Sequence, residues 1–306
     1  MLKVDKVTKC YKDKTVVDHV SFEIKKGHIC GFVGPNGAGK STTMNIITGY
    51  LQATSGTVSI DGLDINSQPM KYRKSFGYLP EFPPLYPDMI VEDYLNFVYD
   101  ARRLAAKERR VQVDEAMEMT EIAHVKRRLI KNLSKGYKQR LGMAQAFLGK
   151  PSLIILDEPT IGLDPFQIVQ VRNIMISLKK KHTVLLSSHI LSEIAEVCDE
   201  IVFINNGNLI AAGTEKELIE KNLKENKYMI KVSNESINMV HGVAAKVSKD
   251  IRVKKIDANV FECSCNAGQD LGKQLLGTLI ADHVQLTEFY EKTNSLEDVF
   301  LELVTK

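Results

Sequence analysis

Hydrophobic and polar positions alternate near the start of the chain, where Val20, Phe22 and Ile24 fall on one face of an extended segment. This period of two predicts a half-buried β-strand. Three further runs, HICGFV, SLIIL and TVLLSS, are short and apolar almost throughout, which is typical of strands buried in a parallel sheet. The helical pattern QIVQVRNIMISLKK separates the last two runs. The order of these segments predicts an α/β core.

From about Val91 to Lys150 the apolar residues recur at spacings of three and four, as in VEDYLNFVYDARRL. This period predicts a helical subdomain, over about residues 89–150, that is inserted into the core. After the core, the segment IVFINNGNLIAAG predicts two strands around an Asn-Gly turn. The charge-rich segment TEKELIEKNLKENK then predicts a helix that would suit a linker.

The last part of the chain predicts a separate small α/β domain. Candidate strands are YMIKV, IRVKKI, VFECSC and LTEFY, and candidate helices are DLGKQLLGTLIADH and SLEDVFLELV. Ser295 and Asp298 have the spacing of a capping box at the start of the last helix. Together these patterns predict two domains, residues 1–222 and residues 223–306, and the length of 306 residues agrees with two.

The composition is that of an ordinary globular protein, with 44% hydrophobic and 26% charged residues. A net charge of +3 is too small to indicate a nucleic-acid partner, and no apolar run reaches the roughly 18 to 20 residues that a membrane-spanning helix requires. The charged N-terminal segment lacks the apolar core of a signal peptide, which predicts a cytosolic address. The five cysteines show no metal-binding spacing, and we expect Cys263 and Cys265 to point to opposite faces of their strand.

The segment GPNGAGKST fits the phosphate-loop pattern G-x-x-x-x-G-K-[ST] through Gly34, Gly39, Lys40 and Ser41. A predicted strand precedes it and a predicted helix follows it. In such a loop the backbone N–H groups and the positive end of the helix dipole face phosphate groups. The lysine bridges the outer phosphates, and the hydroxyl after it binds Mg²⁺. The pattern therefore predicts a nucleotide-phosphate site.

Two acidic residues, Asp157 and Glu158, follow the apolar run LIIL, 117 residues after Lys40. A strand that ends there would deliver Asp157 to the phosphates, where a carboxylate can hold Mg²⁺ through its water shell. Glu158, one residue further, could polarise an attacking water. Two solvated acids at a strand end are the alternative, and the four apolar residues before them make it the weaker interpretation.

The phosphate loop and this acidic strand, in this order, resemble the nucleotide-binding subunit of ATP-binding-cassette (ABC) transporters, over about residues 2 to 220. The resemblance implies an α/β P-loop NTPase cassette: a mixed sheet core, an antiparallel β subdomain and a helical insertion, followed here by the small C-terminal α/β domain. It also implies an ATPase that binds ATP with Mg²⁺. The residues it places around the phosphates are Gly34, Pro35, Asn36, Gly37, Ala38, Gly39, Lys40, Ser41 and Thr42.

Further motifs of this family match single residues. Tyr11 stands where the family stacks an aromatic ring on adenine, although a tyrosine of the strand core is the alternative. Asp164, in IGLDP, stands where an aspartate communicates across a dimer. His189, in SSH, matches a histidine that holds the γ-phosphate and orients the acid that here is Glu158. A lone histidine would more often be structural, but five motifs in register favour the functional interpretation.

The stretch LSKGYKQR resembles the family signature with two changes, since Lys135 and Tyr137 replace a glycine and a glutamine. A signature binds the γ-phosphate of ATP held by the other subunit, through a serine hydroxyl, backbone N–H groups and a helix N-terminus. Ser134 and Gly136 keep those groups, and Lys135 adds a positive charge. We therefore expect a working signature, with degeneration to an inactive site as the alternative.

A third change affects the loop FGYLPEFPPLYP, in which the family usually has a glutamine that touches Mg²⁺ and the attacking water. Here that position is Glu81, whose carboxylate can still accept a hydrogen bond from Mg²⁺-bound water. The resemblance places a groove for the membrane subunit between this loop and the helical subdomain, and we expect Tyr86 to Tyr94 to flank it. The changes and the C-terminal ending SLEDVFLELV together resemble the branch of drug, sodium and gliding-motility type exporters.

One phosphate loop and one signature in a single chain predict a head-to-tail dimer, with two ATP molecules between the subunits. The partners implied are a separate transmembrane permease and a second ABC ATPase subunit, with no nucleic acid, on the cytoplasmic face of the membrane. Two alternatives are a soluble ABC ATPase that acts on nucleic acid or the ribosome, and a regulatory cassette that binds ATP without turnover. The C-terminal domain is a stability or dimerisation appendage or a ligand sensor.

Overall fold

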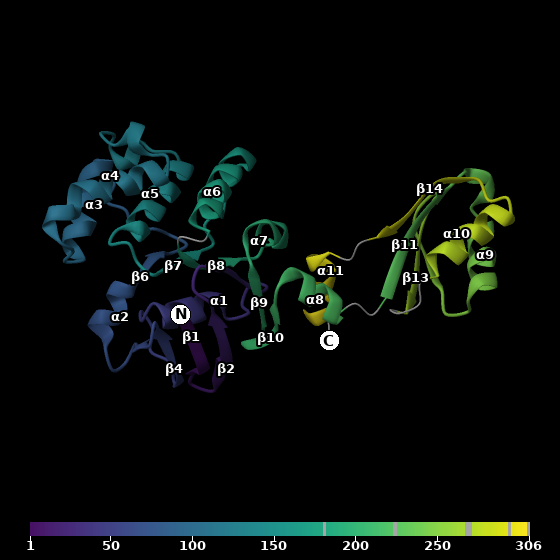
Figure 1. Cartoon of the computed structure of the whole chain (residues 1–306), viewed down its shortest axis with the longest axis horizontal. Helices are drawn as coiled ribbons and strands as arrows, with labels where there is room; N and C mark the ends of the chain where they lie inside the picture. The colour runs from purple at the N-terminus through teal and green to yellow at the C-terminus, as the bar shows by residue number, and fades with distance from the viewer. Residues whose placement is uncertain (180–181, 223–224, 267–270, 293–294, 305–306) are drawn as a thin grey trace. The chain divides into compact units, whose positions relative to one another are not determined.

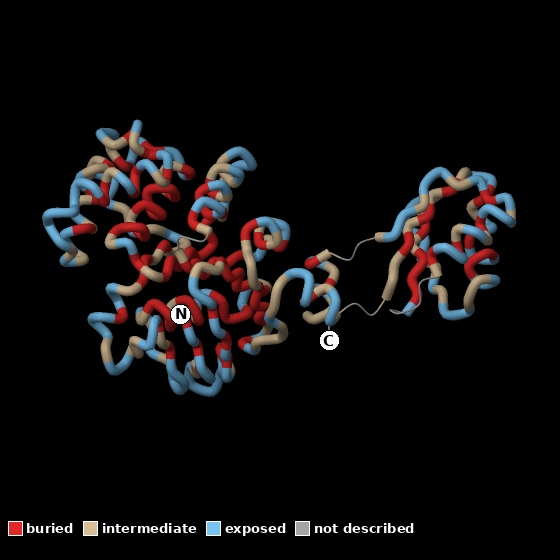
Figure 2. Tube along the Cα trace, viewed as in Figure 1, coloured by how far each residue is buried: buried red, intermediate tan, exposed pale blue. Residues whose placement is uncertain are grey.

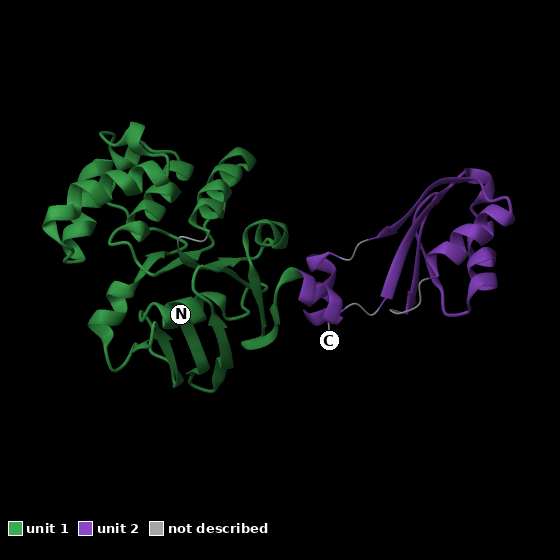
Figure 3. Cartoon of the chain, in the orientation of Figure 1, with its two compact units in different colours: residues 1–215 green, residues 216–306 purple. Residues whose placement is uncertain are grey.

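The computed structural model describes residues 1–179, 182–222, 225–266, 271–292 and 295–304. The chain forms two compact units, residues 1–215 and residues 216–306, which are coloured separately in Figure 3. Figure 1 gives the order of the elements in each unit. The first unit carries the phosphate loop, the acidic strand, the signature and the other motifs of the nucleotide site.

A six-stranded sheet forms the centre of the first unit, in the order β10-β9-β3-β8-β7-β6. Its strands from β9 to β6 pair in parallel, and only β10 at the edge is antiparallel. The strands are β3 (Ile29–Val33), β6 (Phe76–Leu79), β7 (Leu153–Asp157), β8 (Thr183–Ser188), β9 (Glu200–Asn205) and β10 (Asn208–Gly213). The predicted buried runs are β3, β7 and β8, and nearly every residue in them is fully buried.

Because β3, β8 and β7 are parallel neighbours, their carboxyl ends meet at one edge of the sheet. The phosphate loop follows β3, Glu158 follows β7, and His189 follows β8. This topology brings the phosphate loop together with two motifs that lie more than 100 residues further along the sequence. Helices α1 (Lys40–Ile47), α6 (Pro165–Leu178) and α7 (Leu191–Val197) come after these strand ends.

A second, antiparallel sheet has the order β2-β1-β4-β5. Its strands are β1 (Leu2–Tyr11), β2 (Lys14–Ile24), β4 (Ser55–Ile60) and β5 (Leu63–Asp64), followed by helix α2 (Pro69–Ser75). Val20, Phe22 and Ile24 all face the core, as the alternating pattern predicts. The antiparallel sheet, α1 and the parallel sheet share one core, which appears in red in Figure 2.

The helical subdomain lies between β6 and β7 and contains α3 (Val91–Ala101), α4 (Arg109–Met119) and α5 (Lys135–Phe147), with three short 3₁₀ turns. Tyr94 of α3 is only 2% exposed, and its hydroxyl donates to Gln145 of α5. Burial raises the pKa of Tyr94 to about 12. The side chain of Tyr94 is therefore not available at the surface, whereas Tyr86 is half exposed, and the groove beside Tyr86 to Tyr94 stays a prediction.

The second unit begins with helix α8 (Glu215–Asn222) and continues as β11-α9-β12-β13-α10-β14. Its sheet order is β12-β13-β11-β14, with every pair antiparallel, which is the ferredoxin-like split βαβ arrangement. The elements are β11 (Glu225–Val232), α9 (Met239–Val247), β12 (Arg252–Asp257), β13 (Val260–Asn266), α10 (Gly272–Ala281) and β14 (Leu286–Lys292), and α11 (Leu296–Val304) follows. Figure 1 shows α9 and α10 on one face of this sheet.

Three sequence expectations in the second unit need correction. The predicted linker helix ends at Asn222, and the residues from Glu225 onward form a strand because they pair with β13. Helix α9 was not predicted. Cys263 and Cys265 are both buried in the same core, since side chains two positions apart on a strand face the same side, so our expectation of opposite faces was wrong. Cys263 is a free thiol.

Candidate nucleotide-binding site

The phosphate loop, Gly34–Thr42, joins the end of β3 to the N-terminus of α1. Gly39 has a φ of +106°, and a Cβ there would lie 2.9 Å from the carbonyl oxygen of Val16. A Cβ on Gly34 would lie 2.3 Å from the carbonyl oxygen of Ile204. Both positions therefore require glycine, because the backbone turns sharply between two strands that leave no room for a side chain.

Lys40 is the first residue of α1 and is only 7% exposed. Its ammonium group donates to the carbonyl of Gly34 at 2.7 Å and contacts the carbonyl of Pro35 at 3.4 Å. It also lies 3.6 Å from Oε1 of Glu158. The loop's own carbonyls and one acid thus hold this cation within the loop.

Glu158 is the first residue after β7, and it is buried with a φ of +47°. This left-handed backbone conformation is uncommon for a residue with a side chain. Oε2 of Glu158 lies 2.8 Å from Nδ1 of His189, while its Oε1 faces Lys40. His189 is 44% exposed at its side chain, so solvent reaches one side of this pair. An acid held between a histidine and a lysine in this way has the geometry to orient a water molecule.

A cavity of about 550 Å³ lies at this edge of the sheet. Its lining combines the phosphate loop with the residues that follow the other strands. The lining residues are Val16, Pro35, Asn36, Gly37, Gly39, Lys40, Ser41, Thr42, Glu81, Glu158, Ile161 and His189. The cavity therefore unites the phosphate loop, the Glu81 loop, the acid and the histidine in one site.

Tyr11 does not line this cavity. It ends β1, is 48% exposed, and has the ammonium group of Lys9 at 5.1 Å from its ring centroid. Val16, on the next strand, provides the apolar surface beside the phosphate loop. The sequence pattern did not indicate Val16.

The signature lies elsewhere in the unit, at the start of α5. The hydroxyl of Ser134 caps this helix by accepting from the N–H of Tyr137 at 3.4 Å. Gly136 is packed against Gln167 of α6, where a Cβ would lie 2.7 Å from the side-chain amide carbon. The ammonium group of Lys135 lies over Gly162, at 2.1 Å from where a Cβ on that glycine would be. The signature and the IGLDP loop are therefore in contact, and neither Ser134 nor Gly136 lines the cavity.

Two other residues of these motifs have clear local contacts. The side chain of Asp164 accepts from the N–H of Gln167 at 2.9 Å and so caps α6. Tyr137, which replaces a glutamine, bonds through its hydroxyl to Nε2 of His124 at 2.8 Å. The guanidinium of Arg140 lies 4.5 Å from the Tyr137 ring centroid. Tyr137 is thus anchored within the helical subdomain.

Comparison with known proteins gives the family. The family described as "ABC transporter" matches residues 17–161. The linearmycin resistance ATP-binding protein LnrL of Bacillus subtilis (strain 168) is 33% identical, with 99% of this chain and 98% of that protein covered. The bacitracin transport ATP-binding protein BcrA of Bacillus licheniformis is 31% identical, with 99% and 97% covered. This chain belongs to the ATP-binding proteins of ABC transporters.

A solved structure agrees with this assignment. The ATP-binding cassette MJ0796, in a dimeric post-hydrolysis state bound to ADP and Pi, is 25% identical and has a TM-score of 0.63. The match covers 70% of this chain and 98% of that one. The ABC ATP-binding protein described here is accordingly an ATPase with the P-loop cassette fold, and its ligand is ATP. No helix in the described ranges is long and apolar enough to cross a membrane.

The donor atoms at the cavity of this ABC protein fit Mg²⁺. Ser41 and Glu81 line the cavity, and Asp157, which does not line it, directly precedes the lining residue Glu158. The hydroxyl and the two carboxylates are oxygen ligands of the kind that Mg²⁺ prefers. Burial raises the pKa of Asp157. A hydrogen bond from Ser187 opposes that shift, whereas the negative charges of Glu158 and Glu81 add to it. A cation near these three acids would offset their repulsion.

In the described part of the chain, no three His, Cys, Asp or Glu side chains converge as a closed metal site. This is compatible with Mg²⁺, because a nucleotide-bound Mg²⁺ takes one or two protein carboxylates and completes its shell with phosphates and water.

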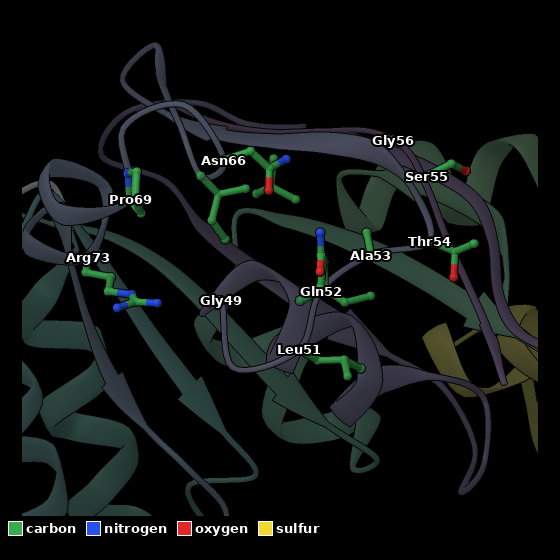
Figure 4. Close-up of a pocket in the computed structure, with 13 residues that line it drawn as sticks. Gly49, Leu51, Gln52, Ala53, Thr54, Ser55, Gly56, Asn66, Pro69 and Arg73 are labelled. Carbon is green, nitrogen blue, oxygen red and sulfur yellow. The ribbon is translucent and has the colours of Figure 1, made fainter.

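A second cavity, of about 430 Å³, lies away from the phosphate loop. Figure 4 shows it between the stretch from Gly49 to Gly56, Asn66, and the α2 residues Pro69 and Arg73. Arg73 is the one charged residue in its lining, which includes neither an acid nor a residue of the phosphate loop. This cavity is therefore not the nucleotide site.

The sequence did not indicate two polar side chains at the carboxyl ends of the central parallel strands. We call this edge of the sheet, which carries Asp157, Glu158 and His189, the catalytic edge. Ser187, at the end of β8, hydrogen-bonds to both Asp157 and the backbone of Glu158. Thr160 is 4% exposed, and its hydroxyl donates to Oε2 of Glu193 at 2.6 Å. Two serines at the end of the otherwise apolar run TVLLSS were the available signal for Ser187.

Proposed function

We propose that this ABC ATPase powers a membrane exporter whose permease is a separate chain. The relatives named for linearmycin resistance and bacitracin transport support this, since resistance fits outward transport of a compound. The proposed location is the cytoplasmic face of the membrane, where the permease partner would hold the subunit. The domain expected over residues 223–306 is proposed as an accessory domain.

The residues that line the cavity are the observation that supports a dimer as the active form. The cavity contains the phosphate loop, Glu158 and His189 but no signature residue. A complete site then takes Ser134 and Gly136 from a second subunit, which supports a head-to-tail pair of identical chains with two ATP molecules between them. The dimeric state of MJ0796 supports the same arrangement. In such a pair Asp164 and the IGLDP loop would face the other subunit, next to its nucleotide.

The geometry supports a division of roles in hydrolysis. Lys40 and the phosphate loop hold the β- and γ-phosphates, and Glu158 accepts a proton from the attacking water as that water forms its bond to the γ-phosphorus. The bond from this phosphorus to the β,γ-bridging oxygen breaks, and ADP is the leaving group. His189, at 2.8 Å from Glu158, keeps the carboxylate oriented and contacts the γ-phosphate. Tyr11 would contact the adenine. When bound by Ser41, Glu81 and Asp157, Mg²⁺ would neutralise charge on the phosphates.

A hydrophobic patch next to the Glu81 loop supports a permease partner. Tyr86 is 51% exposed and Phe97 of α3 is 47% exposed, and their ring centroids are 5.5 Å apart. The buried Tyr94 supports the ring of Tyr86 at 6.1 Å. Exposed aromatic clusters of this kind are typical of protein contacts. We call these two residues the Tyr86–Phe97 patch and propose it as part of the permease-docking surface.

The first test combines turnover with recovery of the partner. Tagged Glu158→Gln protein is incubated with solubilised membranes of the source organism, with and without ATP and Mg²⁺, and the bound proteins are identified by mass spectrometry. Phosphate release is measured in parallel for the wild type, Glu158→Gln and Glu23→Gln, in which an exposed acid of β2 is changed instead.

If the protein powers an exporter, a protein with many membrane spans should be recovered. Of the three proteins, only Glu158→Gln should lose phosphate release, by about 10² to 10⁴-fold. Recovery of ribosomal or DNA-bound proteins with no membrane protein in either condition would contradict the exporter. Wild-type protein that binds ATP without releasing phosphate would indicate the regulatory cassette.

A further inference from the structure

Ser187 is the most deeply placed polar group of the catalytic edge. It lies on β8 directly opposite Asp157 of β7 and is 0% exposed. Its hydroxyl donates to Oδ1 of Asp157 and accepts from the backbone N–H of Glu158 at 2.9 Å. A single hydroxyl therefore contacts both acidic residues, and the motif SSH, to which it belongs, was used above only for its histidine.

The backbone of Glu158 needs such support. With a φ of +47°, it occupies a region that residues with a Cβ enter at a cost, and surrounding contacts must stabilise it. Its N–H is bonded to Ser187, and its carbonyl accepts from the N–H of Ile161 at 3.1 Å. The two bonds fix the peptide groups on either side of the bend.

This bend decides where the carboxylate lies. Because Glu158 leaves the extended path of β7, its Oε1 comes to 3.6 Å from Lys40 and its Oε2 to 2.8 Å from His189. Relaxation of the backbone toward an extended conformation would move the carboxylate away from both partners. The hydrogen bond to Asp157 likewise fixes which oxygen of that carboxylate points toward Ser187.

We propose that Ser187 is a positioning residue for ATP hydrolysis: its hydroxyl holds Glu158 in the left-handed conformation that aims the carboxylate at the attacking water. The proposal rests on the proposed function in one respect, namely that Glu158 acts on the water. A purely structural serine, which only satisfies buried polar groups, is the interpretation to be excluded.

Thr183→Val provides a matched control for Ser187→Ala. Thr183 lies at the other end of β8, is 1% exposed, and its hydroxyl accepts from the N–H of Gly27 at 2.9 Å. Each change removes one buried hydroxyl that accepts from a backbone N–H, so both should lower the melting temperature by similar amounts. Only Ser187→Ala should reduce kcat, by about tenfold or more, because small displacements of a catalytic group are costly.

The KM for ATP should change less than about threefold in Ser187→Ala, since the phosphate loop does not use this hydroxyl. Ser187→Cys, which keeps a weaker donor and acceptor at the same place, should have a kcat between those of the wild type and Ser187→Ala. It also serves as the test if Ser187→Ala does not fold. Equal kcat in the wild type, Ser187→Ala and Ser187→Cys would overturn the proposal.

A double substitution distinguishes an effect of Ser187 through Glu158 from an effect that is independent of Glu158. In the Glu158→Gln background the residual phosphate release, followed over hours, should fall less than about twofold when Ser187→Ala is added, because the group it positions is already lost. Multiplication of the two effects would show that Ser187 acts independently of Glu158 and would overturn the proposal. Full turnover by Glu158→Gln itself would instead contradict the proposed function.

Discussion

The Nζ atom of Lys40 lies 3.6 Å from Oε1 of Glu158, and both side chains are more than nine-tenths buried. A buried cation and a buried anion at this distance stabilise each other, and removal of either leaves the other uncompensated. In the proposed site the same cation also meets the phosphates of ATP. The pair therefore links nucleotide binding to the acid that acts on water.

Lys40→Ala should weaken ATP binding by about 10²-fold or more, because a buried charge that contacts a phosphate is lost. Binding of a fluorescent ATP analogue measures the effect. Lys3→Ala, which changes an exposed lysine of β1, is the control and should bind like the wild type. Equal affinity in both variants would show that this cavity is not the phosphate site.

Glu81→Gln tests the second of the two acids that line the cavity. Glu81 lines the cavity together with Ser41 and Glu158, and its negative charge adds to the upward shift of the pKa of Asp157. Loss of that charge should tighten binding of ATP without Mg²⁺ by about threefold or more, because repulsion of the phosphates falls.

The same substitution should raise the Mg²⁺ concentration needed for half-maximal phosphate release, since one oxygen ligand of full charge is gone. Titrations of ATP without Mg²⁺ and of Mg²⁺ at saturating ATP give the two values, with Glu23→Gln as the control. Parallel changes of both values in the same direction would contradict a role of Glu81 at the metal.

The phosphate loop and the Asp157 strand could be read from the sequence because each is a local signal, a glycine pattern or an apolar run that ends in acid. The short apolar runs likewise indicate strands that are buried in a parallel sheet. The contact of Ser187 with Glu158 could not be read, because it depends on the register between β7 and β8, which no local pattern encodes. The left-handed conformation of Glu158 is equally a result of tertiary contacts.

The sequence also did not indicate which aromatic side chains are exposed to solvent. Tyr86 and Tyr94 look alike in an aromatic stretch, yet only the packing of α3 on α5 buries Tyr94. In the second unit, helix α9 has nine residues with Gly242 in the middle, which gives a weak helical signal, and its packing with α10 on the sheet supplies the stability.

The Tyr86–Phe97 patch gives a prediction for docking. Tyr86→Ser combined with Phe97→Ser should lower the affinity for permease-containing membranes by about tenfold or more, because aromatic contacts dominate protein interfaces. Sedimentation with membranes and with protein-free lipid vesicles measures the effect. Met70→Ser, which changes an exposed residue of α2, is the control. If the double variant and the control bind membranes equally, this patch is not part of the docking surface.

The start of α11 provides a test in the second unit. The hydroxyl of Ser295 accepts from the N–H of Asp298 at 3.2 Å, and Oδ2 of Asp298 accepts from the N–H of Ser295 at 3.0 Å. This reciprocal pair is the predicted capping box. Ser295→Ala should destabilise the helix by about 1 kcal/mol. Faster amide hydrogen exchange over residues 296–304 would report this loss, and Thr287→Ala, at an exposed position of β14, should leave the exchange as it is.

The capping box also predicts that the stability of helix α11 depends on pH. Burial acts to raise the pKa of Asp298, but the hydrogen bonds from Ser295 and the positive charges of Lys292 and Lys227 outweigh it, and the pKa is lowered. A carboxyl group with a lowered pKa stabilises the folded state above its unfolded pKa of about 3.9, and this contribution is lost as the pH falls through the folded value. The protection factors of the α11 amides, which are exchange rates corrected for the intrinsic rate at each pH, should therefore fall in acid for the wild type. Asp298→Asn should exchange faster at neutral pH and lose most of the acid response. An equal acid response in both proteins would show that the titration of Asp298 does not control this helix.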